Sequence, residues 1–417
     1  MKILVVGGGA REHTICWKLN QSNMVTKIYC APGNAGISQI AKCVDIKAED
    51  IEKITDFSVD NNIDMVVVGP EGPLVDGLVD ILMEKGIKAF GPSKKGARLE
   101  GSKSYSKDFM KKYNIPTAKY ETYIDSKKAL EGLHNFTTPI VIKADGLAAG
   151  KGVLICETIN EAKDAINSIM RDKQFGEAGN TVVIEEFLNG IETSLLCFVN
   201  GKDIIPMESA RDYKKAYDND KGLNTGGMGC FSPNPIYTES LKKYIKENIL
   251  DTTLNGFIEE NMDFKGILFI GLMITGDEAK VLEYNTRFGD PETEVVLPRL
   301  KSDLCKVMEK TIDGTLTLKD LQWTEMHSTT VVLASGGYPD NYEKGKEITG
   351  LDLVDEDVIV FHGGTKLSEG KILTDGGRVL AVTALGDTIE EARNKVYKNI
   401  EKIKFDKMEY RKDIAKL

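Results

Sequence analysis

Three short apolar runs in the first hundred residues each end in a glycine-rich loop. They are residues 3–6, 27–31 and 65–68, and the loops cover residues 7–9, 32–36 and 69–72. The first loop opens a stretch with helical spacing, so the local order is strand, glycine loop and helix. This order is typical of a doubly wound parallel sheet, whose ligands bind outside the carboxyl ends of the strands. We therefore expect an N-terminal α/β domain with a polar, ligand-binding edge.

The first loop does not match a dinucleotide-binding fingerprint. The third small residue of that fingerprint would stand at position 12, which is Glu12, and no acidic residue follows the next strand to bind a ribose. A glycine loop before a helix still favours an anion, so we interpret it as a site for a smaller phosphate. An ordinary tight turn is the alternative. In the third loop, Glu71 could bind an amine or a sugar hydroxyl, or be a solvated carboxylate.

Residues 280–292 combine a predicted strand with polar side chains and a sharp turn. Glu283 and Asn285 are two positions apart, so on a strand both side chains leave the same face. A carboxylate beside an amide oxygen suits Mg²⁺, which keeps waters and phosphate oxygens as its other ligands. Arg287 follows on the same alternation, before the turn at residues 289–291. The segment predicts a metal site and a phosphate-binding guanidinium; a polar strand ending in an ordinary turn is the alternative.

Residues 139–156 predict a hairpin whose two strands are joined by a glycine-rich loop. The first strand ends in Lys143, and Lys151 precedes the second strand. Glycine follows Lys151 and no helix begins there, so the loop is not a Walker motif. Backbone N–H groups of such a loop can close over a triphosphate, to which Lys143 adds a fixed charge. We interpret the hairpin as a flap over ATP; a hairpin without a ligand is the alternative. Lys103 could also contact phosphate or be solvated.

Two further stretches place polar groups where a ligand could bind. The predicted strand at residues 181–188 runs into acidic residues, and Glu192 follows after a turn. Backbone groups at such a strand end can bind a flat base, and the carboxylates can bind ribose hydroxyls; an edge strand with exposed acids is the alternative. The glycine cluster at residues 224–229 lies far from any predicted helix and favours a turn close to a ligand. Asp212 is a candidate partner for an ammonium group.

Composition narrows the class of partner and the compartment. The net charge is −10 over 417 residues, which argues against nucleic acid or an acidic membrane surface as the main partner. Seven scattered cysteines without a Cys-x-x-Cys pair fit a reducing cytosol. No apolar run approaches the ~20 residues of a membrane span, and the first residues lack the regions of a signal peptide. We expect a cytoplasmic protein that binds small molecules.

Together these segments resemble the glycinamide ribonucleotide synthetase (phosphoribosylamine–glycine ligase) family of ATP-grasp enzymes, over essentially the whole chain. The segments that carry the resemblance are residues 7–13, 32–36, 68–71, 142–152, 224–229 and 287–292. Two positions depart from it. Ala10 stands where the family often has glycine, and Gly271 stands near the place where many ATP-grasp relatives carry another metal carboxylate.

The expected architecture is α/β and α+β, in three domains. Residues 1–101 form the N-terminal doubly wound domain, and residues 102–325 form the ATP-grasp domain, with residues 118–190 as its ATP lid. Short strands and a capped helix after about residue 322 predict a small α+β domain at residues 326–417, with no chemistry that the sequence identifies.

The resemblance implies ATP-dependent ligation of glycine to 5-phosphoribosylamine in purine biosynthesis, through a glycyl phosphate. It implies Mg²⁺ or Mn²⁺ on Glu283 and Asn285. The catalytic candidates are Lys143, Asp212, Arg287 and Asp290. The expected ATP contacts are Lys103, Lys143, Gly146, Gly150, Lys151, Glu185, Glu186, Phe187, Leu188 and Glu192. The expected substrate contacts are Gly9, Asn34, Glu71, Asn224, Gly226, Arg287 and Gly289.

Two other functions remain open at this stage. The same scaffold could ligate another carboxylate to another amine, which titration of glycine and phosphoribosylamine against ADP release would decide. A non-catalytic ATP-binding regulator would be expected to lack a residue such as Lys143 or Glu283, and both are present. We expect a monomer or a weak homo-oligomer.

Overall fold

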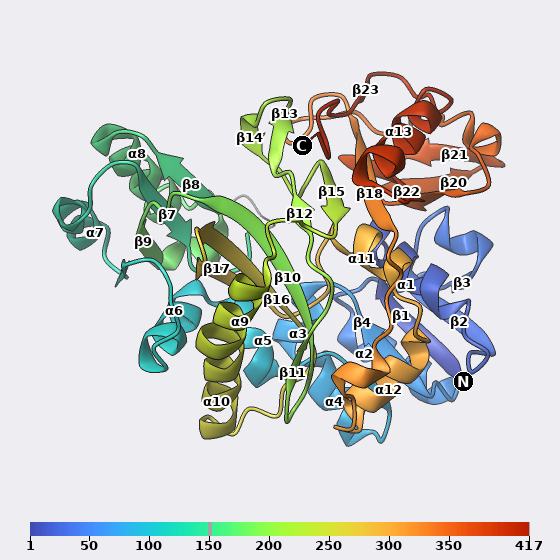
Figure 1. The fold of residues 1–417 in the computed structure, drawn as a ribbon, viewed down its shortest axis with the longest axis horizontal. Coiled ribbons are helices and arrows are strands. Elements are labelled where there is room, and N and C mark those ends of the chain that lie inside the picture. Colours follow the sequence, from blue (N-terminus) through green and yellow to red (C-terminus); the bar gives the residue numbers. More distant parts are fainter. Residues whose placement is uncertain (149–151, 417) are drawn as a thin grey trace.

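The structure is a computed structural model that describes residues 1–148 and 152–416. Its strands form four larger sheets and two small hairpins, which Figure 1 shows as a lobe at the left and a larger body at the right. In the part of the chain that is described, no helix is both long enough and apolar enough to cross a membrane.

The N-terminal sheet is parallel, as the glycine-loop pattern predicts, and it has five strands. Their order is β3-β2-β1-β4-β5. The strands are β1 (Lys2–Gly7), β2 (Lys27–Pro32), β3 (Lys42–Cys43), β4 (Met65–Val68) and β5 (Lys88–Phe90). The helices that follow them are α1 (Ala10–Leu19), α2 (Ile51–Asp60), α3 (Glu71–Asp76), α4 (Leu78–Glu84) and α5 (Lys94–Gly101). Alternate residues of β1 enter two different cores, so both faces of the sheet are buried.

The lid sheet is antiparallel and forms the lobe at the left of Figure 1. Its strands, in the order β6-β9-β7-β8, are β6 (Tyr120–Tyr123), β9 (Val182–Glu186), β7 (Ile140–Ala144) and β8 (Val153–Cys156). Helices α7 (Ser126–Gly132) and α8 (Ile159–Met170) pack against it around one apolar core. Lys143 pairs with Val153, which confirms the predicted hairpin on either side of the glycine loop.

The central sheet carries the segment predicted to hold a metal ion. Its order is β11-β10-β16-β17, formed by β11 (Ile204–Pro206), β10 (Ile191–Asn200), β16 (Lys265–Thr275) and β17 (Glu278–Asn285). The helices α6 (Lys103–Lys112), α9 (Glu239–Ile245) and α10 (Asp251–Glu259) contribute to the core on one face. The β16–β17 hairpin turns at residues 276–277.

The C-terminal sheet includes strands that precede residue 326. Its path is β12-β15-β18-β22-β19, and β23 pairs with β18. These strands are β12 (Arg211–Asp212), β15 (Gly229–Ser232), β18 (His327–Ser335), β22 (Arg378–Gly386), β19 (Val358–His362) and β23 (Met408–Glu409). The remaining elements are the hairpins β13 (Lys215–Tyr217) with β14 (Lys221–Asn224) and β20 (Thr365–Ser368) with β21 (Lys371–Thr374), and helices α11 (Thr293–Arg299), α12 (Leu304–Ile312) and α13 (Ile389–Ile400).

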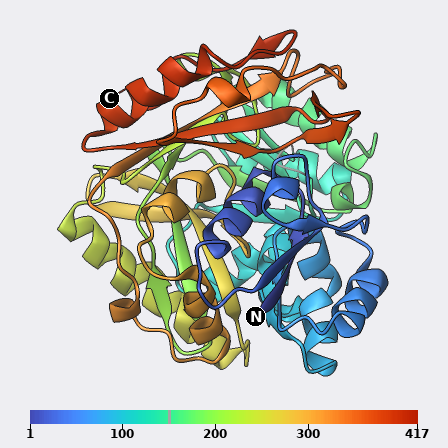
Figure 2. The ribbon, with the colours of Figure 1, turned by 90° about the vertical axis from the view of Figure 1, so that its right-hand side faces the viewer.

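Asn34 joins the N-terminal part of the chain to the C-terminal part, which lies above it in Figure 2. Its amide nitrogen donates to the carbonyls of Gly8 (3.0 Å), His362 (2.6 Å) and Gly363 (3.3 Å). Its amide oxygen accepts from the N–H groups of Gly36 and Ile37. The whole side-chain amide is therefore used in holding two loops together.

We expect Asn34→Ala to lower the free energy of unfolding by about 2 to 4 kcal/mol, because it leaves several backbone groups without partners. Urea denaturation followed by circular dichroism measures the change. Asn61→Ala is the matched control, since the Asn61 amide donates to one carbonyl at the end of α2. An equal loss in the two variants would contradict this role for Asn34.

Candidate active site

A cavity of about 700 Å³ is lined by residues of the lid, central and C-terminal sheets and by residues of helices α1, α3, α5 and α6. It brings together most of the residues singled out from the sequence: Glu71, Lys103, Lys143, Glu185, Glu186, Phe187, Leu188, Glu192, Asp212, Asn224, Gly226, Glu283, Asn285, Arg287 and Asp290. Among the predicted residues that the structure describes, Gly9, Asn34, Gly146 and Gly289 do not line this cavity. Gly150 and Lys151 lie outside the described residues.

A β-bulge in β17 turns Glu283 and Asn285 toward the cavity. Val281 pairs with Leu272 of β16 and Glu283 pairs with Gly271, so Leu282 is an extra residue between the two pairs. Without this bulge, Glu283 would share the face of Val281, which is buried in the core under the sheet. The bulge exchanges the faces, so that Tyr284 enters that core instead.

Glu283 and Asn285 are two oxygen donors that a metal ion could bind. Within the described chain, neither side chain has a hydrogen-bond partner, and both line the cavity. Burial would raise the pKa of Glu283, but Lys214, Lys143 and Lys103 lower it to about 2. Over the same residues there is no cluster of three metal-binding side chains. A metal here would therefore take its remaining ligands from waters and phosphates, as Mg²⁺ does.

Lys143 belongs to a buried ion cluster that the sequence did not reveal. Its ammonium lies 2.8 Å from one carboxylate oxygen of Glu185, and Lys107 lies 2.9 Å from the other. All three side chains are buried. Burial and repulsion from Lys143 lower the pKa of Lys107 to about 8, whereas the two lysines together lower the pKa of Glu185. Glu185, predicted as an ATP contact, thus holds the lysine that faces the cavity.

The start of α6 is tied to the start of the glycine flap. The backbone N–H of Lys103 donates to the carbonyl of Asp145 (2.9 Å), and its ammonium donates to the carbonyl of Gly146 (3.2 Å). The carboxylate of Asp145 in turn accepts from the N–H of Ser104 (2.6 Å). Lys103 is therefore placed where the flap begins, at the cavity wall.

Arg287 is held by two carboxylates at the N-terminal side of the cavity. Its guanidinium lies 2.9 Å from Glu100 and 3.4 Å from Glu71. Burial would raise the pKa of Glu71, but Arg287 and Arg11 lower it. Burial raises the pKa of Glu100, which also accepts from the N–H of Thr286 (2.7 Å). Glu71 is thus an ionised group facing the cavity rather than a solvated loop residue.

In the first glycine loop, where a small phosphate was expected, a carboxylate of the protein itself lies at the N-terminus of α1. The carboxylate of Glu12 accepts from the N–H of Gly9 (2.7 Å) and from Arg11 (2.6 Å). A methyl group added at Gly7 or Gly69 would lie 2.6 Å or less from Glu12. The glycines therefore make room for an internal carboxylate at the N-terminus of α1, where the helix favours an anion.

Asp212 is an acid without a partner of its own. Its Oδ1 atom is buried and, within the described residues, accepts no hydrogen bond. Burial and the nearby Glu292 carboxyl raise the pKa of Asp212 well above its usual range. A cation placed beside it would restore the ionised form, so the position suits the ammonium group of a ligand.

Several residues that line the cavity escaped prediction, chiefly Glu100, Lys107, Lys214, Glu292 and Arg378. Lys214 forms an ion pair with Glu192, which was expected to bind ribose. Arg378 lies in the C-terminal part and reaches Asp290 at 2.8 Å. Lys107 lies four positions after Lys103, so both side chains share one face of α6; that spacing could have drawn attention to it. Nothing local in the sequence marks Arg378.

Three family models cover nearly the whole chain. Residues 1–100 match the phosphoribosylglycinamide synthetase N domain, residues 101–293 its ATP-grasp (A) domain, and residues 328–417 its C domain. The bulge, the buried lysines and the flap hairpin all lie within the second match.

Two curated relatives match this chain over nearly their full length. The chain is 52% identical to a phosphoribosylamine–glycine ligase of Clostridium acetobutylicum over 416 residues, with 100% of both chains covered. It is 49% identical to the enzyme of the same name from Caldanaerobacter subterraneus, over 100% of this chain and 99% of that one.

Solved structures show the same fold. The crystal structure of phosphoribosylamine–glycine ligase from Thermotoga maritima matches with a TM-score of 0.88 and 36% identity, over 99% of this chain and 100% of that one. A biotin carboxylase domain from Hydrogenobacter thermophilus, described in complex with MgADP, matches at 0.76 and 15% identity, over 98% and 91% of the two chains. The match to the biotin carboxylase domain shows a shared fold and nothing more.

We expect Glu185→Gln to lower the free energy of unfolding by about 3 to 5 kcal/mol, because it leaves two buried ammonium groups without their carboxylate. Chemical denaturation measures this loss. Glu186→Gln, one residue further along the same strand, is the control. Its half-exposed carboxylate lies 3.5 Å from Lys280, and we expect a change below about 1 kcal/mol. Equal effects at the two positions would contradict a structural role for the buried cluster.

Proposed function

The chain belongs to the phosphoribosylglycinamide synthetase family, whose enzymes join glycine to phosphoribosylamine with ATP, and we propose that the 700 Å³ cavity is where this chain does so. The chain is thus an ATP-dependent ligase of purine biosynthesis. We place the active site in this cavity because Glu283 and Asn285 line it without a hydrogen-bond partner in the described chain. They lie beside buried lysines at the base of the flap hairpin.

The chemistry requires activation of the glycine carboxylate, because an oxide ion is a poor leaving group. In the route we propose, a carboxylate oxygen attacks the γ-phosphorus of ATP, and ADP leaves. The amine of phosphoribosylamine then attacks the acyl carbon of glycyl phosphate, and phosphate leaves as the nitrogen loses a proton. The protein contributes positioning and charge neutralisation to both steps.

We assign the metal to Glu283 and Asn285, with Mg²⁺ or Mn²⁺ as the ion. Both donors are hard oxygens without partners in the described chain, and Glu283 is ionised. A bound divalent ion would supply positive charge to the nucleotide phosphates. Lys214, Lys143 and Lys103 set the ionisation of Glu283, so the protein keeps this ligand ready at neutral pH.

We assign the nucleotide to the wall formed by the lid sheet. The backbone of residues 186–188 leaves β9 at the cavity and would hold the adenine, with Glu192 near the ribose. Lys103 and Lys143 would face the phosphates, because both line the cavity next to Glu283. The loop that begins at Gly146, and that includes Gly150 and Lys151, would close over them and exclude water, which would otherwise hydrolyse the acyl phosphate.

We assign the two amine-bearing substrates to the opposite wall. Asp212 would take an ammonium group, since its buried oxygen has no partner in the described chain. Arg287 would bind the glycine carboxylate or the transferring phosphoryl group, and Asp290 would orient an amine. Glu71 and Asn224 would contact phosphoribosylamine, and Gly226 would shape the wall beside it. Gly9 and Asn34 are not included, because internal contacts use their polar groups.

The same proposal places the reaction in the cytoplasm, in a monomer or weak homo-oligomer. Another carboxylate or amine would be the alternative substrate pair. ADP release that depends on both glycine and phosphoribosylamine supports the pair proposed here.

We expect Glu283→Gln to weaken binding of the Mn²⁺·ATP complex by about 100-fold, because a unit charge next to the ion is lost. Electron paramagnetic resonance of Mn²⁺ measures binding independently of turnover. Glu278→Gln on the same strand is the control, since Glu278 is exposed and does not line the cavity. We expect Asn285→Ala to weaken binding in the same direction. Unchanged binding in both variants would reject the metal assignment.

We expect one oxygen of ¹⁸O-labelled glycine carboxylate to appear in the released phosphate, because the glycyl phosphate route transfers that oxygen to phosphorus. The ³¹P NMR isotope shift of phosphate measures it. A parallel reaction in ¹⁸O-water with unlabelled glycine controls for hydrolysis of ATP. Unlabelled phosphate alongside normal product formation would reject the acyl phosphate.

A further inference from the structure

Two side chains of the C-terminal part bind the backbone N–H and the backbone carbonyl of one residue, Gly226, at the cavity wall. The N–H of Gly226 donates to the hydroxyl of Tyr338 (3.1 Å), and the carbonyl of Gly226 accepts from Arg378 (2.9 Å). A methyl group added at Gly226 would lie 2.8 Å from the guanidinium carbon of Arg378. The glycine is therefore needed for this close approach, and the loop between β14 and β15 is fixed from outside its own segment.

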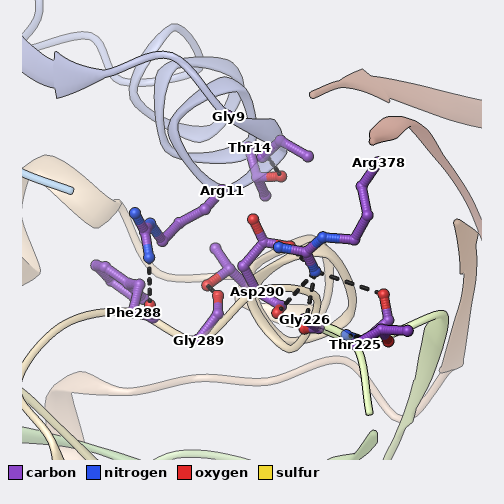
Figure 3. Close-up of polar contacts among 12 residues, drawn as sticks. Gly9, Arg11, Thr14, Thr225, Gly226, Phe288, Gly289, Asp290 and Arg378 are labelled. Atoms are coloured by element: carbon purple, nitrogen blue, oxygen red, sulfur yellow. Dashed lines mark hydrogen bonds and ion pairs between the residues drawn. The ribbon is translucent and has the colours of Figure 1, made fainter. Parts of the chain in front are cut away.

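Arg378 also holds Asp290, on a third segment of the chain. The same guanidinium nitrogen lies 2.8 Å from the Asp290 carboxylate and donates to its backbone carbonyl (3.1 Å). Figure 3 shows Arg378 reaching from β22 between Asp290 and the Gly226 loop. Within the described residues, Asp290 has no other ion-pair or hydrogen-bonding side-chain partner. One side chain thus sets the distance between two parts of the cavity wall.

Arg378 lies among three acidic groups. Asp212 and Glu294 lie close enough to raise the pKa of Arg378 by their charge, as does Asp290. Glu294 is fully buried, and neither carboxyl oxygen has a hydrogen-bond partner in the described chain. Burial, with the repulsion of Asp290, raises the pKa of Glu294 well above its usual range. The guanidinium is the positive charge at the centre of this acidic group.

We propose that Arg378 is a positioning residue for the amine-binding wall of the active site, so that the C-terminal part completes a site built by the preceding segments. It would act by fixing Asp290 and the Gly226 loop against each other, and so hold the amine in line with the acyl carbon. This inference rests on the proposed function. In the part of the chain that the structure describes, Arg378 forms no hydrogen bond or ion pair with Lys103, Lys143 or residues 186–188 of the nucleotide wall, so ATP binding should not depend on it.

The test compares Arg378→Met and Arg378→Lys with Arg393→Met in the full chain. Arg393 also donates to two backbone carbonyls of the C-terminal part, those of Ile414 and Lys412, but it does not line the cavity. The measurements are kcat for glycinamide ribonucleotide formation and the ATP dissociation constant from equilibrium binding. Arg378→Lys keeps the charge but not the fork of donors.

We expect Arg378→Met to lower kcat by about 100-fold, as a misplaced reacting group does, while the ATP dissociation constant changes by less than about threefold. Arg378→Lys should lie between it and the wild type, and Arg393→Met should match the wild type. Tyr338→Phe, which removes one hydrogen bond to Gly226, should lower kcat by less than about tenfold.

Wild-type kcat in both Arg378 variants would overturn the inference. A parallel loss of ATP affinity in Arg378→Lys would also overturn it, since that result indicates a general structural role. Failure of the wild-type chain to form glycinamide ribonucleotide would instead reject the proposed function, so the two failures are distinguishable.

Discussion

The extra residue in β17 is the constraint on which the candidate active site depends. A strand offers only two faces, and the face of Val281 belongs to the apolar core beneath the central sheet. Because Leu282 interrupts the pairing with β16, the next residues change faces, and Glu283 and Asn285 reach the cavity without a break in the strand. Gly271, directly opposite Glu283, leaves space for this arrangement, since a methyl group there would lie 3.3 Å from the Glu283 side chain.

The acidic residues near the cavity fall into two groups, which differ in whether other groups of the protein bind them. Glu12, Glu100 and Glu185 are buried and bind cations or N–H groups of the protein itself. Glu283 and Asp212 have no such partner in the described chain, although they lie among the same cations and acids. A buried ion pair contributes little net stability, but it fixes the place of each charge. The first group therefore sets the geometry within which the second can meet ligands.

The sequence predicts the features of this arrangement that depend on residues close together in the chain. The glycine loops after apolar runs predict the parallel sheet, and the spacing of residues 143–153 predicts the flap hairpin. The pair Glu283 and Asn285 is correctly placed on one face, although the simple alternation that suggested it is broken by the bulge. Residues that act across long separations give no such signal. Asn34 meets His362, and Arg378 meets Gly226, only because the sheets bring them together.

The first glycine loop shows what a local sequence pattern leaves undetermined. Its glycines and the helix after it do attract an anion, as the pattern predicts. The anion is Glu12, three residues further along the same chain, and no sequence rule distinguishes an internal carboxylate from a bound phosphate. Asn34 was expected to contact substrate because the family resemblance implied it. Its hydrogen bonds show that its side chain joins two loops of the protein.

The C-terminal sheet contains strands from two distant segments of the chain, and this limits where the chain can be cut. Strands β12 and β15 precede residue 326, yet β15 pairs directly with β18, and β12 pairs with β15. A fragment cut at the start of β18 would expose the edge on which β15 lies, and such unpaired edges invite association with other chains. A chimaera that exchanges the C-terminal portion between homologues must therefore also exchange residues 211–232. Otherwise the paired strands β15 and β18 would come from different homologues.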